Sequence, residues 1–126
     1  MKMWIAVIAL AGTLTGGVAE AALSDGNRLL KACRLVVKFA DGEQIPSNQN
    51  VEFGYCLGLM AGVSGTMMLH NDLLQPADKI CFPLHNISNE QSARIVVKYL
   101  GNHPEELDKP SAFLAFLAYA EAYPCK

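Results

Sequence analysis

Apolar residues recur at helical spacing in four stretches of the chain, and glycine, proline and small polar residues separate these stretches. In the first stretch the apolar residues share one side of a helix that would run from Asp25 to Ala40, and Gly42 follows as a stop signal. The pattern therefore predicts a first helix over these residues. Its apolar positions are Leu29, Leu30, Cys33, Val36, Val37 and Ala40.

A second helix is predicted from about Gln49 to His70, and it carries three glycines spaced by four on one face: Gly54, Gly58 and Gly62. A glycine inside a helix costs about 1 kcal/mol relative to alanine, so three in register need an offsetting gain. We expect another helix of the core to pack closely against this face. A dimerising helix in a membrane is the alternative. It is disfavoured because the uncharged run from Phe53 to Leu69 is short for a span.

A third helix is predicted to begin at Ser88 and to end at Leu100. Ser88 and Gln91 fit a capping box, in which the serine oxygen and the glutamine side chain both satisfy free amides at the helix start. The segment before it, from Asn71 to Ile87, has no sustained period and contains two prolines, so we expect a long exposed connection. Connections of this length are often functional. The expected buried stripe of the helix is Ala93, Val96, Val97 and Leu100.

A last helix is predicted from Leu107 to Tyr123, with Pro104 near its start and Pro110 placed where it could kink the helix. Apolar residues cover more than one side of this helix, which is typical of a helix that is central in a bundle or covered by a partner. The four helices together predict an all-α fold, a small four-helix bundle. The apolar residues of the last helix are Phe113, Leu114, Phe116, Leu117, Tyr119, Ala120 and Tyr123.

The N-terminus has the pattern of an export signal over residues 1–21. Lys2 supplies a positive start, Ile5 to Leu14 an apolar region, and Ala19-Glu20-Ala21 a cleavage site between small residues. We expect the folded domain to cover residues 22–126 and to act in the periplasm, without stable membrane insertion after cleavage. A retained anchor is the alternative, but the apolar run is only about half of the ~20 residues that a spanning helix needs.

Composition excludes one class of partner. The formal net charge is −2, and the ten basic residues are spread along the chain without a cluster. Nucleic-acid binding usually requires a basic stripe, so neither DNA nor RNA is an expected partner. An electrostatic membrane-surface role is unsupported for the same reason.

The four cysteines indicate a disulfide framework, because an even number in an exported chain favours disulfides. Free thiols and a zinc site are the alternatives, but zinc ligands favour closely spaced pairs and these cysteines are far apart in sequence. Four cysteines allow three pairings. In an up-down-up-down bundle, Cys33 and Cys56 lie at one level, and Cys81 and Cys125 meet at one end. We therefore predict the pairs Cys33–Cys56 and Cys81–Cys125.

The chain offers little material for catalysis. His70, His85 and His103 each lie near a predicted helix end, outside any catalytic or metal-binding motif. Glu105 and Glu106 fall in a first helical turn, where the helix dipole favours negative charge. We expect no enzyme activity, no metal and no cofactor.

Several short motifs, taken in order along the chain, carry a family resemblance. The motifs are Tyr55-Cys56-Leu57-Gly58 with Gly62, Ile80-Cys81-Phe82-Pro83, Ser88 with Gln91, Lys98-Tyr99-Leu100 with His103-Pro104, and Tyr123-Pro124-Cys125. From about Leu29 to Cys125 the chain resembles the Rap/Tai family of type VI secretion amidase immunity proteins. The resemblance implies a small helical periplasmic protein, often a homodimer. Such a protein binds a peptidoglycan-cleaving amidase effector and blocks its active site.

The connection before the third helix is the expected recognition surface, because an oxidised bundle would present it as a pre-organised polar loop. The broad apolar face of the last helix is expected to contribute to a homodimer. A general periplasmic binding or stress protein, which would hold unfolded clients on apolar surfaces, is the rival hypothesis. The residues expected to reach the effector are Asn71, Asp72, Gln75, Asp78 and Lys79.

Overall fold

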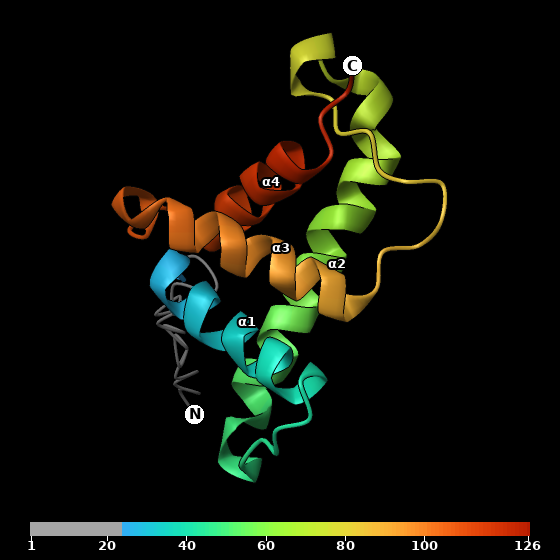
Figure 1. Ribbon diagram of the computed structural model, residues 1–126. Coiled ribbons are helices and arrows are strands. Elements are labelled where there is room, and N and C mark those ends of the chain that lie inside the picture. Colours follow the sequence, from blue (N-terminus) through green and yellow to red (C-terminus); the bar gives the residue numbers. More distant parts are fainter. Residues whose placement is uncertain (1–23) are drawn as a thin grey trace, which may run out of the picture.

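The computed structural model describes residues 24–126, which form four α-helices joined by loops and short 3-10 turns (Figure 1). The predicted export segment, residues 1–21, lies outside the described residues. Within residues 24–126 the only β-structure consists of two isolated bridges. The prediction of an all-α, four-helix fold is confirmed.

The first helix, α1 (Gly26–Ala40), agrees with the predicted range, and Asp25 serves as its cap. The Asp25 carboxylate accepts a hydrogen bond from the backbone amide of Arg28 at 3.1 Å. This bond favours the charged form and lowers the pKa of Asp25. Beyond the other end of the helix, Gly42 adopts a φ of 91°, a left-handed conformation that favours glycine.

The second helix, α2 (Asn50–His70), has the predicted range, but the prediction for its glycine face is wrong. Gly54, Gly58 and Gly62 are exposed, and a Cβ added at any of them would meet no atom within 4 Å outside the helix itself. The buried side of α2 is formed by Cys56 and Met60. These positions follow the glycines by two residues, which places them on nearly the opposite side of the helix.

The spacing of the glycines showed that they share a face but did not show which face is buried. No helix within residues 24–126 has the length and apolar character needed to cross a membrane.

The third helix, α3 (Asn89–Asn102), begins after Ser88 as predicted. The Ser88 hydroxyl accepts a hydrogen bond from the backbone amide of Gln91 at 3.1 Å. The other half of the predicted capping box is wrong, because the Gln91 side-chain amide donates to the Tyr123 hydroxyl at 2.9 Å. This side chain therefore connects the start of α3 to the end of the chain.

The fourth helix, α4 (Ser111–Ala122), is shorter than predicted. Residues Pro104–Glu106 form a separate 3-10 turn, and Pro110 has a φ of −56° and a ψ of 133°, outside the helical region. Proline disfavours a helical conformation at the residue before it, so a helix cannot run smoothly from Leu107 through this position. Pro110 marks the start of α4 and does not kink it.

The helices α1 and α3 lie side by side, α2 crosses them, and α4 packs against α2 and α3 (Figure 1). Tyr119 of α4 is fully buried where these elements meet. Its hydroxyl lies 3.2 Å from the Met60 carbonyl oxygen and 2.9 Å from Ser92 Oγ, so it joins α4 to α2 and α3. The core comprises Leu29, Ala32, Cys33, Val36, Cys56, Met60, Ile80, Ala93, Val96, Tyr99, Leu100, Leu114, Ala115, Ala118 and Tyr119.

The start of the described chain packs against the beginning of α4. The Ser24 carbonyl accepts a hydrogen bond from the Ser111 amide at 3.0 Å. The Tyr55 hydroxyl donates to Ser111 Oγ at 2.7 Å and also bonds to the Ser24 hydroxyl. Gly26 is buried here, and a Cβ at this position would lie 2.5 Å from Leu114 Cδ1. This close approach requires glycine.

Two disulfides join Cys33 to Cys56 and Cys81 to Cys125. These are the pairs that were predicted from the levels of the cysteines along the helices. The first lies inside the core between α1 and α2, where both cysteines are fully buried. The second joins the connection before α3 to the chain end, and Cys81 is exposed. In the chain-entropy model each of these closures is worth roughly 3 to 4 kcal/mol.

Candidate functional site

Residues 71–88 form the longest connection between helices in the described part of the chain, and they include two 3-10 turns, Asn71–Leu73 and Pro76–Asp78. Figure 1 shows this segment leaving the end of α2, passing beside the C-terminus and returning along α2 to α3. It contains every residue predicted to contact an effector.

The first of these residues, Asn71, has a structural role. Its side-chain Nδ2 donates to the Ile80 carbonyl oxygen at 2.9 Å, and its Oδ1 accepts from the Ile80 amide at 2.9 Å. The side chain is half-buried, and Ile80 itself is only 1% exposed. Asn71 therefore closes the segment 71–80 into a loop at its base.

The other predicted residues lie along the closed loop. Asp72, Gln75 and Asp78 are exposed, and Lys79 is half-exposed beside the buried Ile80. The loop thus presents two carboxylates, one amide and one ammonium group close together in sequence. Such groups can donate to and accept from a polar cleft on a partner.

Large apolar side chains lie in the loop and beside it, and they are not among the residues that the sequence predicted to contact an effector. Leu69 at the end of α2 is 81% exposed and Leu73 is 80% exposed, while Met68 is 50% exposed. The spacing of Leu69 and Leu73 by four residues beside a polar segment is the signal that could have identified them.

The far end of the loop is fixed to the C-terminus. The Cys81 amide donates to the Tyr123 carbonyl oxygen at 2.9 Å, and Ile80 forms an isolated β-bridge with Pro124. The Phe82 ring packs edge-on against Tyr119, with ring centroids 5.4 Å apart. The disulfide from Cys81 to Cys125 adds a covalent link. The loop is therefore held at both ends, by the Asn71 amide and by the chain terminus.

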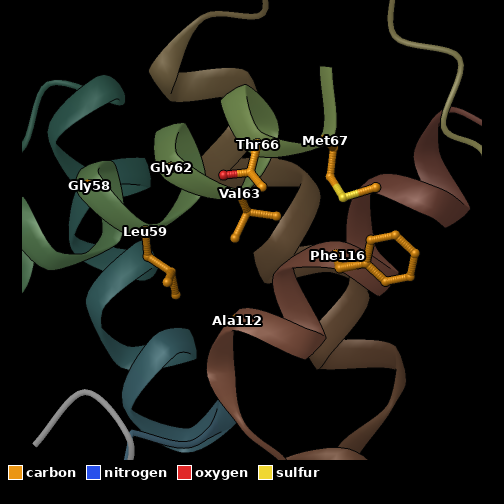
Figure 2. A pocket seen from close by; sticks show the side chains of 8 residues that line it. All are labelled: Gly58, Leu59, Gly62, Val63, Thr66, Met67, Ala112 and Phe116. Carbon is orange, nitrogen blue, oxygen red and sulfur yellow. The ribbon is translucent and has the colours of Figure 1, made fainter. Parts of the chain in front are cut away.

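A second candidate surface is an open groove of about 480 Å³ between α2 and α4. Figure 2 shows the side chains of Leu59, Val63 and Met67 extending from α2 on the side where α4 carries Phe116. The lining contains no charged side chain. Its residues are Gly58, Leu59, Gly62, Val63, Thr66, Met67, Ala112 and Phe116.

Some apolar side chains of α4 face the core, and others line this groove or lie at the surface. Leu114, Ala118 and Tyr119 face the core and are fully buried or nearly so. Phe116 lines the groove, and Phe113 is 47% exposed. The prediction that apolar residues cover several sides of this helix is confirmed, because they extend from the core face to the surface.

The histidines lie near helix ends, as expected, and His103 belongs to an acidic cluster. His103 Nδ1 is 3.3 Å from Glu105 Oε1 and its Nε2 is 3.3 Å from Glu121 Oε2. These carboxylates, Glu105 foremost, raise the pKa of His103. Nearby, the Tyr99 hydroxyl donates to Glu106 at 2.5 Å. No group of three candidate metal ligands occurs within residues 24–126.

The comparisons with known proteins give one match. The family model described as Rap1a immunity proteins matches residues 25–125. No curated protein and no solved structure matches the chain. The matched range covers nearly all of the described residues, including the loop, the groove and all four cysteines.

Proposed function

Because this chain belongs to the Rap1a immunity protein family, we propose that it is a periplasmic immunity protein that binds and blocks a type VI secreted peptidoglycan amidase. The family suggests an immunity function against effectors, and the match over residues 25–125 is the observation that carries the proposal. The chain acts by occupying the effector's cleft, with no catalytic step of its own.

The loop from Asn71 to Ile80 is the proposed blocking element. Its base is closed by the Asn71 amide, and its far end is tied to the C-terminus. A segment that is already ordered loses less conformational entropy on docking, which favours tight binding. The exposed polar groups of the loop hydrogen-bond to the effector's cleft, while Leu69 and Leu73 supply apolar contact area beside it.

Periplasmic action is supported by the two disulfides, since disulfides form and persist in oxidising compartments. The predicted export signal, residues 1–21, would deliver the chain to that compartment. Peptidoglycan and a delivered amidase would meet the protein there.

A loop substitution tests the blocking role. In the variant, Asp72, Gln75, Asp78 and Lys79 are all replaced by alanine, and Asn71 is kept because it closes the loop. We expect inhibition of the amidase to be lost while the circular dichroism spectrum stays that of the native protein. A control replaces four exposed residues far from the loop, three charged and one amide as in the loop set: Arg34, Lys38, Glu43 and Gln44. It should inhibit normally. Undiminished inhibition by the loop variant would exclude the loop as the blocking element.

A homodimer through the α2–α4 groove is the second part of the proposal. Glycines without a contact on their open side let a helix from a second copy approach the α2 backbone closely. This packing would offset the helix-destabilising effect of glycine. The absence of charge from the groove and the exposed Phe113 on α4 suit an apolar interface.

Two glycine substitutions test the dimer. Gly58→Leu fills the groove, whereas Gly101→Leu adds the same side chain at an exposed α3 position that also has no neighbour within 4 Å. Light scattering coupled to gel filtration should show a dimer for the native protein and for Gly101→Leu, and a monomer for Gly58→Leu. A native protein that remains monomeric at every concentration tested would overturn the dimer.

A further inference from the structure

The two disulfides of this fold differ sharply in access to solvent. Cys33 and Cys56 are both 0% exposed, and they join α1 to α2 in the middle of the core. Cys81 is exposed, and Cys125 is half-exposed at the next-to-last position of the chain. Thiol–disulfide exchange requires a thiolate to reach a sulfur atom, so accessibility controls which disulfide reacts.

Few contacts other than the disulfide hold the C-terminal residues in place. The backbone bond from Cys81 to Tyr123 and the bond from Gln91 to the Tyr123 hydroxyl join exposed or half-exposed residues, and Pro124 is exposed although its bridge partner Ile80 is buried. The Phe82 ring contacts the Tyr123 ring, with centroids 5.8 Å apart, and within residues 24–126 its one ring contact with the core is to Tyr119, at 5.4 Å. Segments with few buried contacts open locally at much lower free energy than the whole fold.

We propose that the Cys81–Cys125 disulfide is a thiol–disulfide exchange site for small or protein dithiols, and that its reduction opens residues 81–87 and 123–126 locally. The Cys33–Cys56 disulfide in the core remains oxidised in this step. Residues 71–80 lose the bridge from Ile80 to Pro124, but their base stays closed, because the two hydrogen bonds between Asn71 and Ile80 do not involve the opened residues. The exchange site is independent of the effector that the protein binds.

The exchange step follows ordinary disulfide chemistry. A thiolate of the dithiol attacks Cys81 Sγ, the S–S bond breaks, and Cys125 Sγ leaves as a thiolate. The second thiol of the reductant then attacks the mixed disulfide and releases the Cys81 thiolate. Two electrons pass from the dithiol to the protein, the two cysteines take up two protons, and the reductant leaves as a disulfide.

Reduction of the native protein tests the proposal. The oxidised mature chain is incubated with dithiothreitol without denaturant, quenched at intervals with N-ethylmaleimide, digested and mapped by mass spectrometry. We expect Cys81 and Cys125 to be labelled at least about tenfold faster than Cys33 and Cys56. The reductant can reach the buried disulfide only when a larger part of the fold opens. Equal rates for all four cysteines, or faster labelling of Cys33 and Cys56, would overturn the proposal.

A second measurement locates the opening. Hydrogen–deuterium exchange is compared between the oxidised protein and the half-reduced, alkylated protein isolated from the same reaction. We expect faster exchange in residues 81–87 and 123–126, with α1 and α3 unchanged. Faster exchange throughout α1 and α3 would show that reduction unfolds the domain, and it would contradict local opening.

Discussion

The Asn71 side chain pairs with the backbone of Ile80 as a neighbouring strand would, donating to its carbonyl and accepting from its amide, each at 2.9 Å. Ile80 is buried, so loss of this partner leaves two polar backbone groups poorly satisfied. We expect Asn71→Ala to lower the free energy of unfolding by about 1 to 3 kcal/mol, measured by urea denaturation. The exposed neighbour provides the control, and Asp72→Ala should change stability by less than about 0.5 kcal/mol. Equal effects of the two substitutions would show that the pairing does not close the loop.

A pair of tyrosines tests the central hydrogen bonds of the core. Tyr119 is fully buried, and its hydroxyl bonds to Ser92 Oγ and to the Met60 carbonyl. Tyr119→Phe should therefore lower the unfolding free energy by about 1 to 3 kcal/mol. The same change at Tyr123, whose hydroxyl accepts from the exposed Gln91, should have an effect below about 0.5 kcal/mol. The free energy of unfolding of both variants is measured by thermal or urea denaturation. A larger decrease for Tyr123→Phe than for Tyr119→Phe would contradict this prediction.

Two glycines with opposite surroundings give a third prediction. A Cβ at Gly26 would lie 2.5 Å from Leu114 Cδ1 and 3.0 Å from the Leu107 backbone. Leu114 can move but the backbone yields less readily, so Gly26→Ala should destabilise the fold by about 1 to 3 kcal/mol. Gly101 has no neighbour within 4 Å, and Gly101→Ala should be neutral or stabilising by up to about 1 kcal/mol. The free energy of unfolding of both variants is measured by chemical denaturation. A Gly26→Ala protein as stable as the native protein would refute the close approach.

The His103 cluster predicts a pH-dependent contribution to stability. Glu105 and Glu121 raise the pKa of His103 above its ordinary value of 6.5, so the folded state binds a proton more tightly than the unfolded state. The stabilisation is fully present below pH 6.5 and is lost as the pH rises through the folded pKa. His103→Gln should therefore be less stable than the native protein near pH 5.5, by a margin that shrinks toward about pH 8.5. Urea midpoints at several pH values measure this margin.

The partner carboxylates supply the control for the histidine. Glu121→Gln removes one of the two, so it should reduce the pH dependence that is assigned to His103. Glu106 and Tyr99 lie beside the cluster and remain unchanged in both variants. A constant difference between His103→Gln and the native protein across the pH range would contradict this origin.

Local sequence signals predicted the helices well. The stripe from Leu29 to Val36 and the cap at Ser88 gave the correct positions of α1 and α3, because both signals depend only on residues close together in sequence. Pro110 was interpreted as a kink, although the restriction that proline places on the preceding residue ends any helix from Leu107. The capping residue and the conformational restriction before proline therefore determine where these helices begin and end.

Contacts between distant residues limited the rest of the prediction. The spacing of Gly54, Gly58 and Gly62 defines a face, but only the packing of Cys56 and Met60 decides that this face is exposed. Asn71 has the polarity of a recognition residue, yet its partner is the backbone of Ile80 in a loop without periodicity. The groove that α2 forms with Phe116 likewise arises from two helices that are distant in sequence.

Inhibition of a peptidoglycan amidase tests the proposed function most directly. Type VI secreted amidases are assayed on peptidoglycan while the oxidised protein, residues 22–126, is titrated in, and genes that neighbour the one for this chain are the first source of amidases to be assayed. With the amidase that this protein blocks, we expect hydrolysis to fall linearly and to stop near one equivalent of chain per amidase, because the two proteins form one tight complex. Full hydrolysis by every amidase assayed in the presence of a large molar excess of the chain would contradict the proposed function, and so would a shallow decline without an end point.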